Sequence, residues 1–224
     1  MVDQGYSCGG NIYWEAQEKV YAMGIMVKLK GKQEGMEMNM NTHFFFALVL
    51  PDDIKAYLNA VTEQLKQDFP FKKWLHPADY HITMAFLGNA PDTLKEDAMG
   101  RVESELSNEA SFALELGDIG GFGKSDSPRI LWAGVKQQER LFAIQRKVYN
   151  SCIEAGFELD KKPFKPHITL ARKFEGDSPF SLESVRQMAN VQDKHFEADQ
   201  VALYQTHLGA SPSYEKIFTI NLQK

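Results

Sequence analysis

Two copies of a His-x-Thr motif carry the side chains of this sequence that are best suited to chemistry. The first copy is His81-Ile82-Thr83 and the second is His167-Ile168-Thr169. In an extended strand, residues i and i+2 point to the same face, so each histidine shares a face with its threonine. Imidazole has an unperturbed pKa near 6.5, so near neutral pH one ring can accept a proton while another donates one. The motifs therefore predict acid–base catalysis by a histidine pair.

Such a set of groups matches the needs of phosphodiester hydrolysis. That reaction requires a base to activate water, an acid to protonate the departing oxygen, and donors to the non-bridging oxygens. His81 and His167 can supply the base and the acid in either order, while Thr83 and Thr169 supply hydroxyl donors. A zinc site is the alternative, but the sequence has no His-Glu-x-x-His pattern and no carboxylate at the matching positions. We therefore predict neither a metal nor another cofactor.

The spacing around the motifs indicates an internal duplication. Phe46 and His81 are 35 residues apart, and so are Trp132 and His167. The order of strand, helix and strand recurs in two halves, at about residues 42–122 and 128–222. We expect an α+β fold with two pseudo-symmetric β-α-β lobes, in which antiparallel or mixed sheets flank a central cleft. Equivalent residues of the two lobes would face each other across that cleft.

Hydrophobic periodicity and chain breakers outline the elements that must position the motifs. Helices are expected from Asp52 towards Pro70 and at residues 93–106, 138–155 and 181–191. Strands are expected at residues 44–50, 80–87, 112–116, 130–135, 167–171, 196–205 and 214–222.

Two segments are expected to lack regular structure. The glycines at 120, 121 and 123 predict a mobile loop at the rim of the cleft. Residues 1–39 are rich in methionine and have little periodicity, so we expect a weakly ordered extension before a single bilobal domain at residues 40–224.

Composition limits the classes of partner. The formal net charge is −5, so no overall positive field attracts long nucleic acids, and any RNA should be bound locally at an end. The two cysteines fit a reducing compartment, and we expect a cytoplasmic monomer. The most apolar run, residues 44–50, is far shorter than the roughly 20 residues that cross a bilayer, so we expect no membrane association.

The sequence resembles the two-histidine phosphoesterase superfamily, and within it the bacterial and archaeal RNA 2′,3′-cyclic phosphodiesterases, historically called 2′-5′ RNA ligases. The resemblance spans about residues 42–222 and rests on both motifs and on the segments around them. It implies a bilobal α+β fold and metal-free hydrolysis of RNA 2′,3′-cyclic ends to 2′-phosphates. It also implies that His81 protonates the leaving 3′-oxygen and that His167 activates water. The sequence alone does not order these two roles, because the motifs are nearly identical.

Arg172 and Arg129 are the candidate cations for the phosphate. The resemblance favours a phosphate contact for Arg172, but two-residue alternation from Leu170 would point it away from the cleft. Arg129 precedes a strand, where the position is more typical of a surface turn residue. Among the aromatic residues, Phe46 and Trp132 are expected in the core, and Tyr204 is a candidate for stacking on a base.

Several functions remain open on the sequence alone. The expected partners are RNA 3′ ends or nucleotides that carry a 2′,3′-cyclic phosphate. Alternatives within the same fold are small cyclic nucleotides, 2′-5′ linkages, or the 2′-5′ joining of RNA. An alternative from another class is a non-catalytic module that binds RNA ends or nucleotides.

Overall fold

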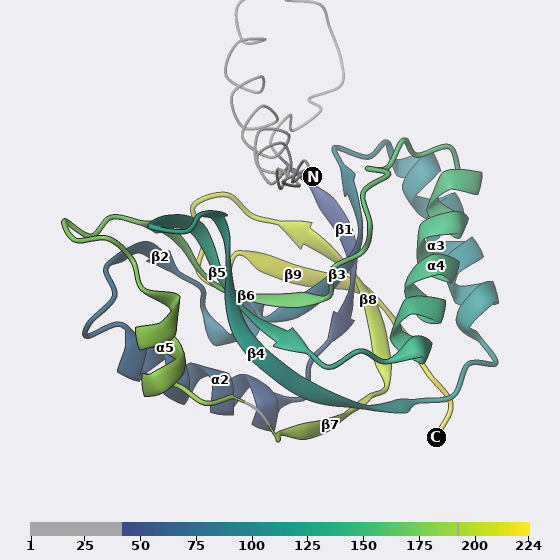
Figure 1. Ribbon diagram of the computed structural model, residues 1–224. Coiled ribbons are helices and arrows are strands. Elements are labelled where there is room, and N and C mark those ends of the chain that lie inside the picture. Colours follow the sequence, from purple (N-terminus) through teal and green to yellow (C-terminus); the bar gives the residue numbers. More distant parts are fainter. Residues whose placement is uncertain (1–41, 192) are drawn as a thin grey trace, which may run out of the picture.

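A sheet of nine strands forms the centre of residues 42–191 and 193–224, the part of the chain that the computed structural model describes (Figure 1). The strands are β1 (Phe44–Val49), β2 (Phe71–Trp74), β3 (His81–Gly88), β4 (Phe112–Lys124), β5 (Ser127–Val135), β6 (His167–Phe174), β7 (His195–Ala198), β8 (Gln200–Thr206) and β9 (Tyr214–Asn221). The helices are α2 (Asp52–Leu65), α3 (Asp92–Leu106), α4 (Glu139–Glu154) and α5 (Leu182–Met188), with a short 3-10 turn at Pro77–Asp79. The α+β class expected from the sequence is confirmed. The predicted extension at residues 1–39 lies outside the described residues.

The two motif strands meet at the middle of the sheet. The strand order is β7-β4-β5-β6-β3-β1-β8-β9, and β2 pairs with β6 beside this path. β3 and β6 are antiparallel, and Ile82 of the first motif pairs with Ile168 of the second. Because these are the central residues of the two motifs, the pseudo-two-fold axis passes between them. We call β3-β1-β8-β9 the first lobe and β6-β5-β4-β7 the second lobe.

Each lobe contains strands from both halves of the sequence. β4 belongs to the first half of the chain, yet it pairs with β5 and β7 in the second lobe. β8 belongs to the second half, yet it pairs with β1 in the first lobe. The helices follow the same exchange, since α3 packs on α4 and α2 contacts α5 (Figure 1). This exchange supports our proposal that residues 40–224 form one domain with two duplicated halves.

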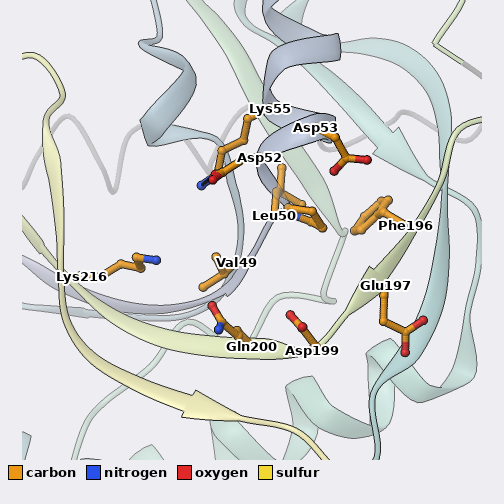
Figure 2. A pocket seen from close by; sticks show the side chains of 11 residues that line it. Val49, Leu50, Asp52, Asp53, Lys55, Phe196, Glu197, Asp199, Gln200 and Lys216 are labelled. Atoms are coloured by element: carbon orange, nitrogen blue, oxygen red, sulfur yellow. Dashed lines mark hydrogen bonds and ion pairs between the residues drawn. The ribbon is translucent and has the colours of Figure 1, made fainter. Parts of the chain in front are cut away.

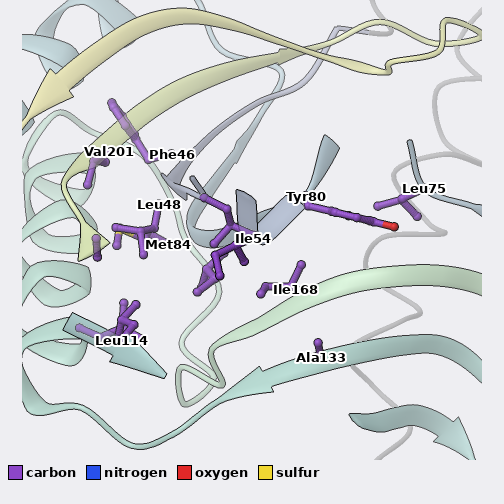
Figure 3. Packing of buried hydrophobic residues seen from close by; sticks show 14 of the residues in the cluster. Phe46, Leu48, Ile54, Leu75, Tyr80, Met84, Leu114, Ala133, Ile168 and Val201 are labelled. Carbon is purple, nitrogen blue, oxygen red and sulfur yellow. The ribbon is translucent and has the colours of Figure 1, made fainter. Parts of the chain in front are cut away.

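The helices and one face of the sheet enclose the hydrophobic core. Phe46, Leu48, Ile54 and Ile168 point into it from β1, α2 and β6 (Figure 3). Ile82 and Ile168 are fully buried there, so burial of apolar area stabilises the pairing of the motif strands. Residues on either side of these isoleucines must therefore point to the opposite face of the sheet.

The glycine-rich segment is not the loop that its composition suggests. β4 continues through it to Lys124, and Gly120 pairs with Trp132 of β5. A Cβ atom at Gly120 would lie 2.2 Å from Cζ2 of Trp132, so only glycine leaves room for the indole ring. The expectation of a mobile loop at 120–123 is therefore wrong.

Other boundaries also differ from the sequence pattern. α5 spans only Leu182–Met188, and the short strand β2, which has two exposed lysines, was not expected. The N-cap of α2 is Pro51, without a side-chain hydrogen bond, and Asp52 and Asp53 follow it. The two aspartates lie in the first turn, where negative charge favours the helix dipole.

Gly120→Ala tests the packing of Trp132 against β4. We expect it to destabilise the protein by about 1–3 kcal/mol, since the added methyl group overpacks the indole ring. Gly100→Ala is the matched control, because nothing lies within 4 Å of its Cβ position and alanine favours the helix α3. Urea unfolding should show a lower free energy of unfolding for Gly120→Ala and a slightly higher one for Gly100→Ala. Equal stability of both variants would contradict this account.

Candidate active site

Pairing of β3 with β6 places both motifs on one face of the sheet. Ile82 pairs with Ile168, and the charge of His167 contributes to the lowered pKa of His81, so the two imidazoles lie near each other. All four side chains are partly exposed, whereas the isoleucines between them are fully buried. The structure therefore brings together the two histidines and two threonines predicted from the sequence.

Backbone carbonyls fix the tautomer of both imidazole rings. Nδ1 of His81 lies 2.7 Å from the carbonyl oxygen of Asp79, and Nδ1 of His167 lies 2.7 Å from that of Lys165. A carbonyl oxygen only accepts, so Nδ1–H donates in each ring and Nε2 carries the free lone pair. Nε2 of His81 accepts from the Thr83 hydroxyl at 3.0 Å. Nε2 is thus the ring atom that can accept a proton in each histidine.

Aromatic rings surround His81 and hold its pKa down. Its ring centroid lies 4.7 Å from that of Phe45, 5.3 Å from Tyr214 and 5.7 Å from Tyr204. Burial among these rings, together with the positive charge of Arg172, lowers the pKa of His81 to about 4. His81 is therefore neutral at pH 7 in the free protein.

His167 has a similar but more open environment. Its ring meets Phe122 edge-on at 5.0 Å, and Trp132 lies 6.4 Å away. Burial lowers its pKa, and Arg172 again adds to the effect. A negative charge placed next to both rings would raise the pKa of each and favour a protonated imidazole.

Arg172 reaches the site because of a β-bulge. Thr169 pairs with Trp132 and Ala171 pairs with Leu131, so Leu170 is an extra residue in β6. The bulge resets the alternation that would have turned Arg172 away from the cleft. Ile130, which pairs with Arg172, accordingly lies outside the main core cluster. Because the charge of Arg172 affects the pKa of both histidines, the guanidinium lies near both rings.

The other candidates have different positions. Arg129 is the extra residue of a second bulge near the start of β5, and its contact with phosphate stays a prediction. Phe46 lies in the core, as expected. Trp132 does not, since it shares the face of Thr169 and contacts Phe122 beside His167. Tyr204 lies beside His81, but it is only 2% exposed and its ring stacks on Phe45, so the expectation that it stacks on a base is wrong.

Asp79 is a site residue that the sequence did not reveal. It is buried, and its carboxylate accepts hydrogen bonds from the backbone N–H groups of Ser213 and Tyr214 at 2.9–3.0 Å. Its own carbonyl accepts from His81, so one residue orients the imidazole and also anchors Tyr214 against it. More than 130 residues separate the partners, and no motif signals such a contact.

A polar pocket of about 460 Å³ adjoins the first lobe of the site (Figure 2). Val49, which pairs with His81 across β1 and β3, lines it. Figure 2 shows Lys55 and Lys216 on one side and Asp53 and Glu197 on the other. The pocket is therefore lined by side chains of both charges, and the charge of Lys55 contributes to the lowered pKa of His81.

Residues 42–191 and 193–224 contain neither a clustered metal site nor a membrane-spanning helix. No three or more His, Cys, Asp or Glu side chains of this region are grouped so that they could hold a metal ion. No helix in the same region has the length and apolar character of a membrane span.

Comparison with known proteins gives the family. Residues 50–210 match the model of the 2′-5′ RNA ligase superfamily. The chain belongs to the 2′-5′ RNA ligase superfamily. This result confirms the resemblance that the twin motifs and their flanking segments indicated.

Two relatives of this superfamily member are RNA 2′,3′-cyclic phosphodiesterases. The protein of Geobacillus stearothermophilus is 36% identical over 176 residues, which cover 79% of this chain and 56% of that protein. The chain thus spans little more than half the length of this relative. The protein of Bacillus subtilis is 32% identical over 186 residues, which cover 82% of this chain and 98% of that protein.

Two solved structures share the fold of this superfamily member. LigT of E. coli is 21% identical with a TM-score of 0.64, and the match covers 82% of this chain and 99% of LigT. A protein of Thermus thermophilus is 25% identical with a TM-score of 0.63, and the match covers 81% of this chain and 98% of that protein.

The lowered pKa of His81 predicts how stability depends on pH. The unfolded chain protonates this residue near pH 6.5, whereas the folded protein resists protonation until about pH 4. Between these values the unfolded state binds more protons, so the free energy of unfolding falls as the pH is lowered. The free energy of unfolding in urea should fall less between pH 7 and pH 4.5 for His81→Gln than for the wild type. His195→Gln, which replaces an exposed histidine, is the control. Equal losses of unfolding free energy in the wild type and both variants would contradict the prediction.

Proposed function

We propose that this protein hydrolyses the 2′,3′-cyclic phosphodiester ends of RNA to 2′-phosphates, with His81 and His167 as the acid–base pair. The observation that carries the proposal is the pairing of Ile82 with Ile168, which sets both imidazoles beside one axis on one face. The names of the relatives from Geobacillus and Bacillus support the reaction and the RNA substrate.

The two histidines divide the proton transfers. His167 accepts a proton from water at Nε2 as the water oxygen bonds to phosphorus, and protonated His81 donates from Nε2 to the departing 3′-oxygen as that bond breaks. The buried surroundings that lower the pKa of His81 make its protonated form a strong acid towards the 3′-oxygen. This division follows the roles that the family resemblance implies.

The neighbouring polar side chains hold the phosphate. Thr83 and Thr169 donate hydroxyl hydrogen bonds to its non-bridging oxygens, and Arg172 balances the negative charge that grows during the reaction. Arg129, at the bulge in β5, is a more distant candidate for the same charge. We propose no metal for these steps. A cytoplasmic monomer remains the expectation from composition.

The alternatives differ in what the site would do with a cyclic end. Small cyclic nucleotides and 2′-5′ linkages would use the same two proton transfers. Joining of RNA would replace water by a 5′-hydroxyl, which needs a second bound strand. A protein that only binds RNA ends would have the same site but would not hydrolyse the substrate. Both histidines and both threonines that the reaction needs are present here.

Removal of either imidazole tests the catalytic assignment. In EDTA, the wild type should convert an oligoribonucleotide with a 2′,3′-cyclic end to a 2′-phosphate, as followed by ³¹P NMR. His81→Ala and His167→Ala should each lower kcat by about 10²–10⁴-fold, the contribution of one positioned proton transfer. His195→Ala, which replaces an exposed histidine of β7, should keep the wild-type rate. Activity that persists in both site variants, or that EDTA abolishes, would refute the proposal.

Replacement of the arginines tests which one contacts the phosphate. Arg172→Ala should lower kcat/KM by about 10- to 100-fold, because hydrogen bonds to charged groups contribute about 1.5–3 kcal/mol. Arg172→Lys should recover only part of this loss, since lysine lacks the planar pair of donors. The kcat/KM of Arg129→Ala is compared with that of Arg172→Ala to decide which arginine contacts the phosphate. Steady-state kinetics in which Arg172→Ala matches the wild type would contradict its assigned role.

A further inference from the structure

Lys73 of β2 and Arg172 of β6 lie directly opposite each other on adjacent strands. Cα atoms of opposite residues in antiparallel strands lie about 4.5–5.5 Å apart. The next pair along these strands is Trp74 with Ala171, and both belong to or pack against the hydrophobic core. Because side chains alternate along a strand, Lys73 and Arg172 point to the other face of the sheet, which carries the histidines.

Lys73 also contacts the segment that packs against His81. Its Nζ atom donates to Oγ of Ser213 at 3.2 Å, and the next residue, Tyr214, meets the imidazole ring of His81 edge-on. β2 and β3 both pair antiparallel with β6, so β2 continues the line of β3 beyond His81. Lys73 is exposed, and it therefore lies at the rim of the site on the His81 side.

The protein does not neutralise this pair of cations. Among the residues that the structure describes, no carboxylate lies within ion-pair distance of Lys73 or Arg172. Lys72, the neighbour of Lys73 in β2, does have such a partner, since it lies 3.8 Å from Glu175. Like charges directly opposite each other in a sheet are destabilising. A bound anion would offset this repulsion, so the pair suits a substrate with more than one negative charge.

The two cations act at different positions. The charge of Arg172 lowers the pKa of both histidines, whereas the charge of Lys73 contributes to neither shift. The guanidinium thus lies nearer the reacting phosphate, and the ammonium lies farther out on the same face. In the proposed reaction the departing 3′-oxygen takes its proton from His81, so the nucleoside lies on the side of His81 and Lys73. The phosphate that joins this nucleoside to the rest of the RNA is one ribose away from the cyclic phosphate.

We infer that Lys73 binds this internucleotide phosphate, so the enzyme prefers the cyclic end of an RNA strand to a cyclic mononucleotide without a 5′-phosphate. This inference rests on the proposed function. Arg172 balances the charge of the reacting phosphate, and Lys73 balances that of the phosphate before it. Lysine binds phosphate as a point charge, and a backbone contact of this kind positions a strand without reading its sequence. A single local contact also fits a protein with a net charge of −5.

The test compares two dinucleotides that end in a 2′,3′-cyclic phosphate and differ only in the charge of their internucleotide linkage. One has the ordinary phosphodiester and the other a neutral methylphosphonate, and both carry a 2′-O-methyl group on the first ribose to keep the linkage stable. The wild type should have the lower KM for the charged dinucleotide. Lys73→Ala should raise this KM about 2- to 5-fold, the effect of one exposed ion pair, without a change in kcat. Its KM for the neutral dinucleotide should match that of the wild type.

Salt dependence and two further variants sharpen the test. For the charged dinucleotide, Lys73→Ala should reduce the slope of log KM against log salt concentration by about 0.7, the value for one phosphate contact with a single strand. Lys73→Arg keeps the charge and should retain the wild-type KM and slope. Lys72→Ala is the matched control, because it removes the neighbouring lysine, which pairs with Glu175, and should leave both values unchanged.

The outcomes separate the inference from the proposed function. Equal effects of Lys73→Ala on both dinucleotides, or no effect on either, would overturn the role of Lys73 while hydrolysis by the wild type stands. If the wild type hydrolyses neither dinucleotide, the proposed function fails. Calorimetric titration with the same dinucleotides ending in a 2′-phosphate then decides the role of Lys73 alone. Lys73→Ala should weaken binding of the charged dinucleotide only, and an unchanged affinity would overturn the inference.

Discussion

The pairing of Ile82 with Ile168 is the constraint on which the active site depends. Both side chains are fully buried, so the core fixes which face of each strand is covered. Side chains alternate along a strand, so a slip of one residue would turn His81 or His167 into the core and expose an isoleucine. The same apolar burial that stabilises the sheet therefore sets the register that brings the two histidines together. Stability and chemistry share one structural cause.

Strand exchange between the lobes makes this register cooperative. β4 crosses to the second lobe, and β8 and β9 cross to the first, so neither half of the sequence forms a lobe on its own. The duplicated scaffold supplies equivalent carbonyl contacts to both imidazoles, and the surroundings then make them unequal. Asp79 anchors Tyr214 over His81, whereas the equivalent Lys165 is exposed and anchors no such ring. That difference suits two rings with opposite roles in one reaction.

The sequence predicted the repeated part of the molecule and missed what depends on distant contacts. The two motifs and the equal spacing from Phe46 and Trp132 were sufficient for the α+β class and the family. The bulge at Leu170 was not predictable, because a bulge is defined by the partner strand. Trp132 was assigned to the core because nothing local shows that β4 offers a glycine beneath its ring. The contact of Asp79 with Ser213 was missed for the same reason, since it joins segments far apart in the chain.

The central claim is that one bound phosphorus atom lies within reach of both imidazoles. The most direct test is a titration of ¹⁵N-histidine-labelled protein with adenosine 2′-phosphate, with the Nε2 resonances of His81 and His167 followed by NMR. Our account predicts that both resonances move along one binding curve with the same Kd, and that the pKa of both rings rises in the complex. Movement of only one ring, or two rings that respond with different affinities, would contradict it.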